Sequence, residues 1–374
     1  MSEICERLGQ PGIVGEILAG VLMGPSVLNW VQPDQVLLAL AQIGVMFLLF
    51  QVGLDVEASK LVQVGPTALL VASLGVAIPF AIGCAIMKTV EASWVEAFFV
   101  GASLVATSVG VTARVLASRG LLQQRASRVI LAAAVIDDVL GLLVLAFVSS
   151  LAEGQVHVPG LITTCIVAAA FTVLVAKYGT RTLGRVIPRL EEQLRAGETQ
   201  FNVALIVLFG LSFLAVWVGV AAIVGAFLAG MALSESVGKR VHDLAQGVTE
   251  LLVPFFLAGI GLNLDISVFR SSDTILLSLA VIIAAILSKL IGCGIGALHL
   301  GRMDMLRVGV GMVPRGEVGM VVAQIGLSLG VITKPLYGVV VLMTVVTTIV
   351  APPMLKYAYR NCRPGLPEEK FSLS

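Results

Sequence analysis

Charged residues are scarce in this sequence. Asp, Glu, Lys and Arg make up 13% of its 374 residues, whereas 58% are hydrophobic and the mean hydropathy is +1.02. An ordinary soluble domain carries roughly a quarter charged residues, so this composition excludes a soluble globular protein. The net charge of +1 gives no indication of a nucleic-acid partner.

Cysteine and histidine are also few, and neither is spaced as a set of metal ligands. The odd number of cysteines and their scatter through apolar segments predict neither a disulfide framework nor a zinc site: Cys5, Cys84, Cys165, Cys293 and Cys362. The histidines lie singly, near predicted helix ends: His157, His242 and His299. We therefore expect no cofactor and no metal-dependent enzyme.

Long apolar runs take up most of the chain. A membrane-spanning helix needs about 20 mostly apolar residues, and about twelve such segments leave no room for a soluble domain. A strand of an outer-membrane barrel would alternate apolar and polar residues, whereas residues 129–148 are apolar on every face except at Asp137 and Asp138. The predicted fold class is an all-α polytopic membrane protein with helices at 12–29, 35–54, 65–87, 93–118, 126–152, 158–178, 201–218, 220–235, 245–263, 274–299, 304–329 and 335–358.

Basic residues are distributed unevenly between the two predicted sides. Of the 24 Lys and Arg, 19 lie on the side that carries both termini, including those of the predicted linker at 179–200. The opposite side has Lys88, Arg270 and Lys334. Short cytoplasmic loops are enriched in basic residues, so we expect both termini in the cytoplasm and the chain in a bacterial-type plasma membrane. No cleavable signal pattern begins the sequence.

Two adjacent carboxylates, Asp137 and Asp138, lie in the middle of an apolar segment. Neighbouring side chains on a helix point about 100° apart, so the two carboxylates need different partners. One can face an ion cavity and the other a cation, and Lys289 is the lysine near the middle of another apolar segment. A static ion pair that only orients helices would leave the second carboxylate unexplained.

Two further segments predict interruptions of helices at membrane depth. Residues 104–112 contain Thr107, Ser108 and Thr112 with a glycine, and residues 311–319 contain a proline and glycines beside Arg315 and Glu317. Unwound backbone at such positions exposes carbonyl and hydroxyl oxygens that suit a hard cation. The two predicted helices would run in opposite directions, which is typical of an inverted repeat with a site near the middle of the membrane.

Together these residues resemble the monovalent cation/proton antiporters of the NapA and Kef-type branch, over nearly the whole chain. The matching motifs are Gly15–Gly20 with Gly24-Pro25, Phe47–Leu54, Ala106–Gly110, Asp137-Asp138, Lys289 and Pro314–Gly319. Kef-type members typically have Gln-Asp in place of Asp137-Asp138 and many carry a nucleotide-binding domain after the last helix. NapA-like members usually have one more helix before the first motif.

The resemblance implies an NhaA-like fold with inverted repeats and two broken, crossing helices. It implies a homodimer, with a dimerisation subdomain at about 12–54 and 201–263 and a core subdomain at about 65–152 and 274–358 that moves like an elevator. By the same resemblance, Asp138 binds Na+ or a proton, Asp137 pairs with Lys289, and Thr107 and Ser108 contribute to the site.

The expected function is electrogenic exchange of Na+ (or Li+) for protons, so the ions are cargo and the protein is not an enzyme. A K+-selective or electroneutral exchanger of the same fold is the nearest alternative. A channel or binding receptor is a more distant one. An intramembrane aspartyl protease needs aspartates on separate helices that face each other, which Asp137 and Asp138 cannot do.

Overall fold

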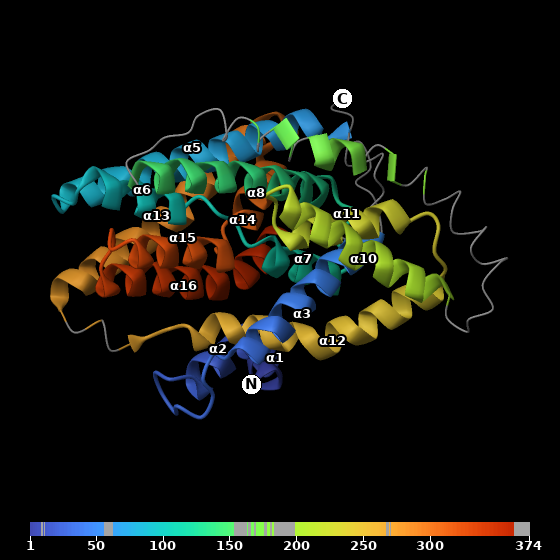
Figure 1. The fold of residues 1–374 in the computed structure, drawn as a ribbon, viewed down its shortest axis with the longest axis horizontal. Helices are drawn as coiled ribbons and strands as arrows, with labels where there is room; N and C mark the ends of the chain where they lie inside the picture. Colours follow the sequence, from blue (N-terminus) through green and yellow to red (C-terminus); the bar gives the residue numbers. More distant parts are fainter. Residues whose placement is uncertain are drawn as a thin grey trace.

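The computed structural model describes residues 1–8, 10, 12–55, 63–152, 199–266, 269 and 271–362, together with 163, 166–167, 170–175, 178–179 and 182. The regular structure in these residues is helical throughout (Figure 1). Among them are seven helices long and apolar enough to cross a membrane. These are α3 (Gln35–Leu54), α5 (Gly65–Thr89), α8 (Arg125–Ala152), α10 (Thr199–Trp217), α12 (Lys239–Leu262), α13 (Ser272–Gly296) and α16 (Lys334–Ala358).

Shorter helices complete the described part of the chain. The apolar ones are α2 (Gly12–Met23), α6 (Trp94–Ser103), α7 (Val109–Ser118), α11 (Ala222–Leu233) and α15 (Glu317–Ser328). The others are α1 (Ser2–Arg7), α14 (Arg302–Gly311) and the 3-10 helix η2 (Leu298–Leu300). In the described part of the chain, an all-helical structure with membrane-length apolar helices is thus confirmed, whereas a total of twelve spans stays a prediction.

Several predicted helix boundaries differ from the observed ones. Helix α3 occupies the predicted range, but the prediction of 12–29 was wrong because α2 ends at Met23, just before Gly24-Pro25. Proline has no backbone N–H to continue a helix. Helix α12 begins at Lys239, earlier than predicted. The prediction missed its first turns because they are polar, whereas the prediction followed apolar residues. Most of the predicted helix at 158–178 and of the linker at 179–200 lies outside the described residues.

Both segments predicted to be interrupted are divided into two helices. The predicted helix at 93–118 is divided into α6 and α7. Residues 104–108 between them are not helical and form only local turns. The predicted helix at 304–329 is α14 and α15, separated at 312–316. The small, hydroxyl-bearing and proline residues in these two segments were the sequence signal that predicted the interruptions.

The helices pack as two groups. In the first group, α3 packs against α11 and α12, α10 packs on α11, and α2 packs on α12. In the second group, α5 packs against α6, α8 and α13, and α16 packs against α7, α13, α14 and α15. The groups meet along α3 and α7, which lie near each other in Figure 1.

Two glycines allow very close backbone contact within the first group. A Cβ atom at Gly53 would collide with the carbonyl oxygen of Phe227, and one at Gly230 with that of Phe50. Glycine therefore allows α3 and α11 to approach until their backbones touch, as small residues do between membrane helices.

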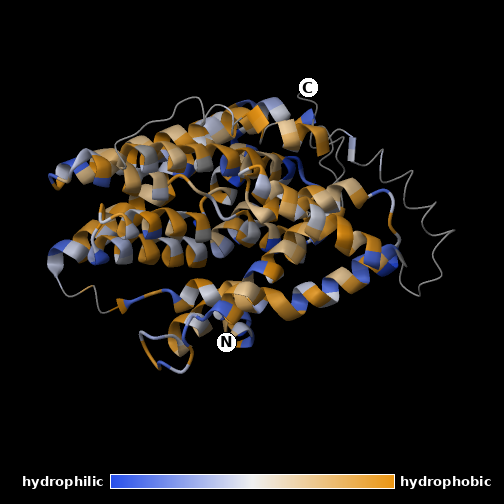
Figure 2. Ribbon diagram, in the orientation of Figure 1, coloured by the Kyte–Doolittle hydropathy of each residue, from blue (hydrophilic) through white to orange (hydrophobic). Residues whose placement is uncertain are grey.

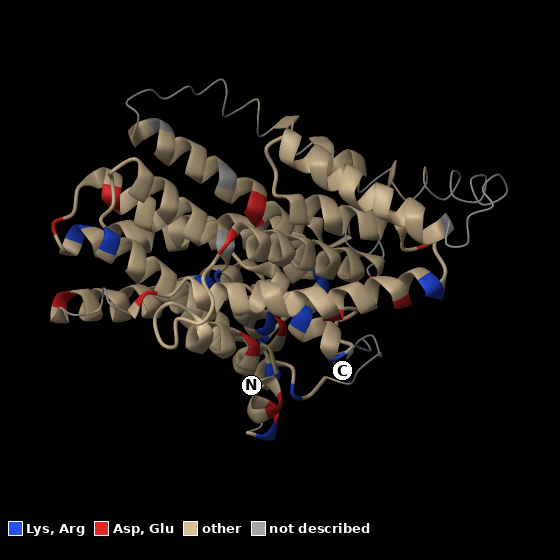
Figure 3. Ribbon diagram, turned by 60° about the horizontal axis from the view of Figure 1, so that its bottom comes forward, with Lys and Arg blue, Asp and Glu red and all other residues tan. Residues whose placement is uncertain are grey.

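The outer surface is apolar along the helices and polar at their ends. Figure 2 shows hydrophobic residues over most of the length of the helices, and large apolar side chains such as Ile206, Phe213 and Leu276 are exposed. Figure 3 shows most charged residues near helix ends, with a few in the interior. A hydrocarbon environment accounts for this surface, because water would disfavour so much exposed apolar area.

Candidate cation site

The buried ion pair joins α8 to α13. Lys289 Nζ lies 2.7 Å from Asp137 Oδ1, and both side chains are completely buried. Gly75 on α5 leaves space for this lysine, since a Cβ there would lie 3.4 Å from Lys289 Nζ and 2.6 Å from Cys293 Sγ. The positive charge therefore compensates the first of the two adjacent carboxylates.

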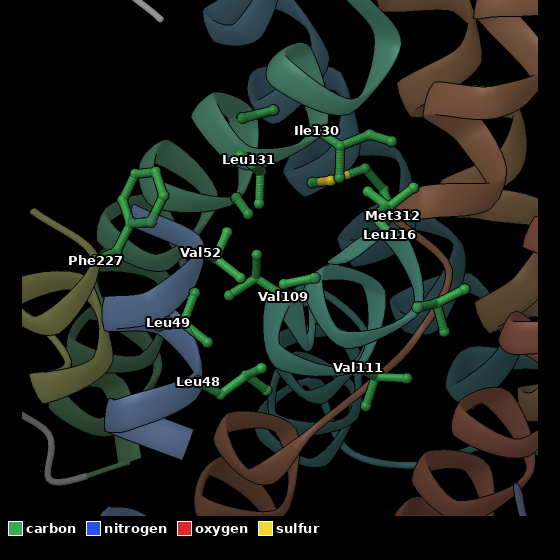
Figure 4. Packing of buried hydrophobic residues seen from close by; sticks show 14 of the residues in the cluster. Leu48, Leu49, Val52, Val109, Val111, Leu116, Ile130, Leu131, Phe227 and Met312 are labelled. Atoms are coloured by element: carbon green, nitrogen blue, oxygen red, sulfur yellow. The ribbon is translucent and has the colours of Figure 1, made fainter. Parts of the chain in front are cut away.

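Asp138, one residue further along α8, faces a different environment. It lines a small pocket between the two helix groups and is only 6% exposed. The other lining residues are all aliphatic or aromatic: Leu49, Ile223, Val224 and Phe227 from the first group, and Val109, Leu131 and Val135 from the second. Figure 4 shows Leu49, Val109, Leu131 and Phe227 around this junction. The Asp138 carboxylate therefore borders a space whose other lining side chains are all apolar.

The first interruption buries two hydroxyl-bearing residues. Thr107 is buried, and its Oγ1 has no hydrogen-bond partner among the described residues. Ser108 is also buried, and its backbone N–H donates to the carbonyl oxygen of Pro314 at 2.8 Å. Thr112 Oγ1 donates to the carbonyl oxygen of Gly311 at 2.7 Å. The two interruptions are thus hydrogen-bonded to each other, and Thr107 retains a buried oxygen suited to a hard cation.

Arg315, in the second interruption, is fully buried. Its Nη1 donates to the carbonyl oxygens of Val105 and Ala106 at 3.3 and 3.4 Å, and its Nη2 to that of Ala285 at 2.9 Å. Its bonds to Val105 and Ala106 therefore satisfy carbonyls that the broken helix leaves without helical partners. Glu317, the other predicted charge of this segment, begins α15, but its side chain lies outside the described part.

Sequence reasoning missed three residues that hold these groups in place. Gly75 makes room for the lysine, and Thr347 and Thr348 of α16 are hydrogen-bonded to the backbone of Arg315. The available signal was a cluster of threonines in an otherwise apolar helix, where hydroxyl groups need partners. Among the described residues there is no cluster of three or more His, Cys, Asp or Glu that could hold a metal ion.

A second pocket is polar and lies at the α1 side of the group boundary. Its acidic lining residues, Glu6 and Glu16, come from α1 and α2. Its basic ones are Arg114 of α7, Arg119 directly after α7, and Lys356 of α16. Charges of opposite sign thus face each other across the pocket from the two helix groups. A space lined by charged side chains at this position suits an access route for ions.

Comparison with known proteins identifies the family. The family model described as "Sodium/hydrogen exchanger, transmembrane" matches residues 1–359. The chain belongs to the sodium/hydrogen exchanger family. It is 34% identical to the Na+/H+-K+ antiporter GerN of Bacillus cereus, covering 96% of this chain and 92% of GerN. It is 31% identical to the high-affinity Na+/H+ antiporter NhaS3 of Synechocystis, covering 98% and 88%.

Solved structures show a similar fold. Two structures of the sodium proton antiporter MjNhaP1 from Methanocaldococcus jannaschii align with TM-scores of 0.65 and 0.72, at 18% and 19% identity. Each alignment covers 96% of this chain, and 93% and 92% of the respective antiporter chain. The predicted family is confirmed, and with it a membrane transporter rather than an enzyme, for which the transported ions are cargo and no cofactor is needed.

Removing one member of the buried ion pair is expected to destabilise the protein strongly. Asp137→Asn leaves an uncompensated ammonium, and Lys289→Gln leaves an uncompensated carboxylate, each lowering the free energy of unfolding by about 3–5 kcal/mol. The double variant is expected to lose far less than the sum, because neither charge remains. Unfolding in detergent, followed by fluorescence, measures this coupling.

The exposed pair Glu3–Arg7 offers a matched control, since its atoms lie 2.9 Å apart in contact with solvent. Glu3→Gln with Arg7→Gln should show almost no coupling, because water screens exposed ion pairs. Strictly additive losses at Asp137 and Lys289 would contradict the importance assigned to the buried pair.

Proposed function

We propose that this protein exchanges Na+ (or Li+) for protons across a membrane, and that Asp138 binds the cation and the proton in turn. The observation that carries the proposal is that the two adjacent carboxylates lie in different environments. Asp137 is compensated by Lys289 at 2.7 Å, whereas Asp138 faces the pocket between the helix groups. The names of GerN and NhaS3 support monovalent cations and protons as the transported ions.

Competition at one carboxylate is sufficient to couple the two ions. Na+ can bind only when the proton has left Asp138, and a proton returns only when Na+ has left. In the proposed cycle, Asp138 crosses with one of the two ions bound. The Thr107 hydroxyl, which is buried near the first interruption, is proposed as a further oxygen ligand, with Ser108 beside it.

Alternating access is proposed to arise from an elevator movement between the two helix groups. The dense packing within each group supports this proposal, with 12–54 and 201–263 as the static dimerisation part and 65–152 and 274–358 as the moving core. The boundary near Asp138 is lined by apolar side chains such as Leu49 and Phe227, which can slide without losing hydrogen bonds. The interruptions between α6 and α7 and between α14 and α15 are proposed to be the two halves of an inverted repeat.

The elevator movement predicts that linking the two groups stops transport. Leu49 belongs to α3 and Val109 to α7, and both line the pocket around Asp138. A cross-link between cysteines at these two positions, in a variant without the native cysteines, is expected to abolish exchange and a reducing agent to restore it. Each single-cysteine variant serves as control. Full turnover by the cross-linked protein would argue against relative movement of the groups.

Orientation and assembly follow from the same proposal. The excess of basic residues on one side favours cytoplasmic termini, which makes the polar pocket with Glu16 and Arg114 the cytoplasmic access route. Labelling of single cysteines from each side of the membrane tests the orientation. The mass of the purified protein in detergent tests the proposed homodimer.

Asp138→Asn is expected to abolish exchange while the protein still folds. The amide has nearly the shape of the carboxylate, but it carries neither a charge for Na+ nor a proton that can be exchanged. Cation-dependent proton release from proteoliposomes measures the effect. Asp273→Asn, at the exposed start of α13, is a control that keeps full activity. Exchange at the wild-type rate by the Asp138 variant would contradict the assignment of Asp138 as the ion-binding residue.

The stoichiometry is proposed to be two protons for each Na+, with Lys289 as the second proton carrier. In this proposal, cation entry draws Asp137 away, and Lys289 releases a proton once its ion-pair partner has left. The exchange then moves charge, and at 100 mV each charge is worth about 2.3 kcal/mol. Electroneutral exchange and K+ transport remain the second candidate, since GerN is named for both Na+ and K+.

Lys289→Gln is expected to remove the transport current. The variant either stops transport or retains an electroneutral remnant that uses Asp138 alone, because glutamine carries no exchangeable proton. Currents on a supported membrane after jumps of Na+, Li+ or K+ concentration measure charge movement and selectivity together. A variant current with the sign and size per ion of the wild type would rule out Lys289 as the carrier.

A further inference from the structure

Three threonines lie within two turns of α16 and are completely buried: Thr344, Thr347 and Thr348. Thr344 Oγ1 donates to the carbonyl oxygen of Val340 at 3.1 Å, within its own helix. The other two hydroxyls also reach out of the helix. They contact the backbone of Arg315 in the second interruption.

The two hydroxyls satisfy both polar backbone groups of Arg315. The N–H of Arg315 donates to Thr347 Oγ1 at 3.2 Å. Thr348 Oγ1 lies 2.7 Å from the carbonyl oxygen of Arg315 and also 2.7 Å from that of Thr344, so its one proton is shared between the two. Thr347 directs its own proton to the carbonyl oxygen of Met343 at 2.8 Å, which leaves an oxygen lone pair to accept the N–H. Buried backbone outside a helix needs such partners, because no water is available to replace them.

Because the backbone of Arg315 is held in place, the direction of its side chain is also fixed. The guanidinium of Arg315 donates to the carbonyl oxygens of Val105 and Ala106, which immediately precede Thr107. A continuous series of buried hydrogen bonds thus runs from α16, through Arg315, to the first interruption. The arginine thereby ties both carbonyl oxygens of the unwound segment to the second interruption.

We propose that Thr347 and Thr348 are positioning residues of the cation site. They fix the backbone of Arg315, whose guanidinium in turn fixes the unwound segment that presents Thr107. The proposal rests on the assignment of Thr107 and Asp138 to the cation. Helix α16 contributes no side chain to the pocket around Asp138. In this proposal it nevertheless influences cation affinity indirectly, through Arg315.

The test compares three substitutions on the same helix. Thr348→Val keeps the shape but removes the hydroxyl, Thr348→Ser keeps the hydroxyl, and Thr344→Val removes a hydroxyl that bonds only to its own helix. Sodium-dependent proton release in proteoliposomes gives the KM for Na+ and the turnover. The rise in unfolding temperature on adding Na+ in detergent gives binding independently of transport.

Thr348→Val is expected to raise the KM for Na+ about fivefold, the loss of one hydrogen bond, and to diminish the Na+-induced rise in unfolding temperature. Thr348→Ser should restore both values, and Thr344→Val should leave both near the wild type. An unchanged KM in Thr348→Val, or an equal change in Thr344→Val, would overturn the proposal. If Thr348→Val does not fold, Thr347→Ala and Thr347→Ser provide the same comparison through the other backbone bond.

Asp138→Asn separates this inference from the proposed function. If Asp138→Asn loses the Na+-induced rise in unfolding temperature while the Thr348 variants keep it, the cation site stands and the role of Thr348 is refuted. If Asp138→Asn keeps the rise, the site itself is misassigned, and the positioning role fails with it.

Discussion

The ion pair between Lys289 and Asp137 lies where water does not reach, and the arrangement of the interior depends on it. An isolated charge in such a place is strongly disfavoured, so α8 and α13 must be in register for the two side chains to meet at 2.7 Å. Gly75 on α5 contributes the space that this register requires. Once Asp137 is compensated in this way, its neighbour Asp138 is turned toward the boundary of the helix groups.

Interrupting two helices at membrane depth exposes backbone groups that regular helices would satisfy. The structure pairs the interruptions with each other, through Ser108 and Pro314 and through Thr112 and Gly311. Arg315 satisfies carbonyls of the first interruption, and threonines of α16 satisfy the backbone of Arg315. The hydroxyl of Thr107 remains as a buried oxygen, which is the chemical property that the proposed cation site needs.

The boundary between the two helix groups has an apolar part and a polar part. Around Asp138 the boundary is lined by aliphatic and aromatic side chains, whereas near α1 it is polar and carries opposite charges on its two sides. Apolar contacts are non-directional, so they tolerate displacement better than hydrogen bonds with fixed geometry. In the proposed mechanism the apolar part slides, and the polar part admits water and ions.

Much was determined by the sequence alone: the helical membrane class, the positions of the interruptions, and the family. Long apolar runs, Pro314 with its glycines, and two adjacent aspartates are local signals, because bilayer thickness and helix hydrogen bonding act on neighbouring residues. The residues by themselves left open which aspartate meets Lys289, and only the resemblance indicated Asp137. The tertiary structure decided this, since Asp137 and Lys289 are 152 positions apart and meet only through the rotation of packed helices. The partners of Arg315 on α16 were decided in the same way, because hydrogen bonds between distant segments depend on how helices pack and leave little trace in the order of residues.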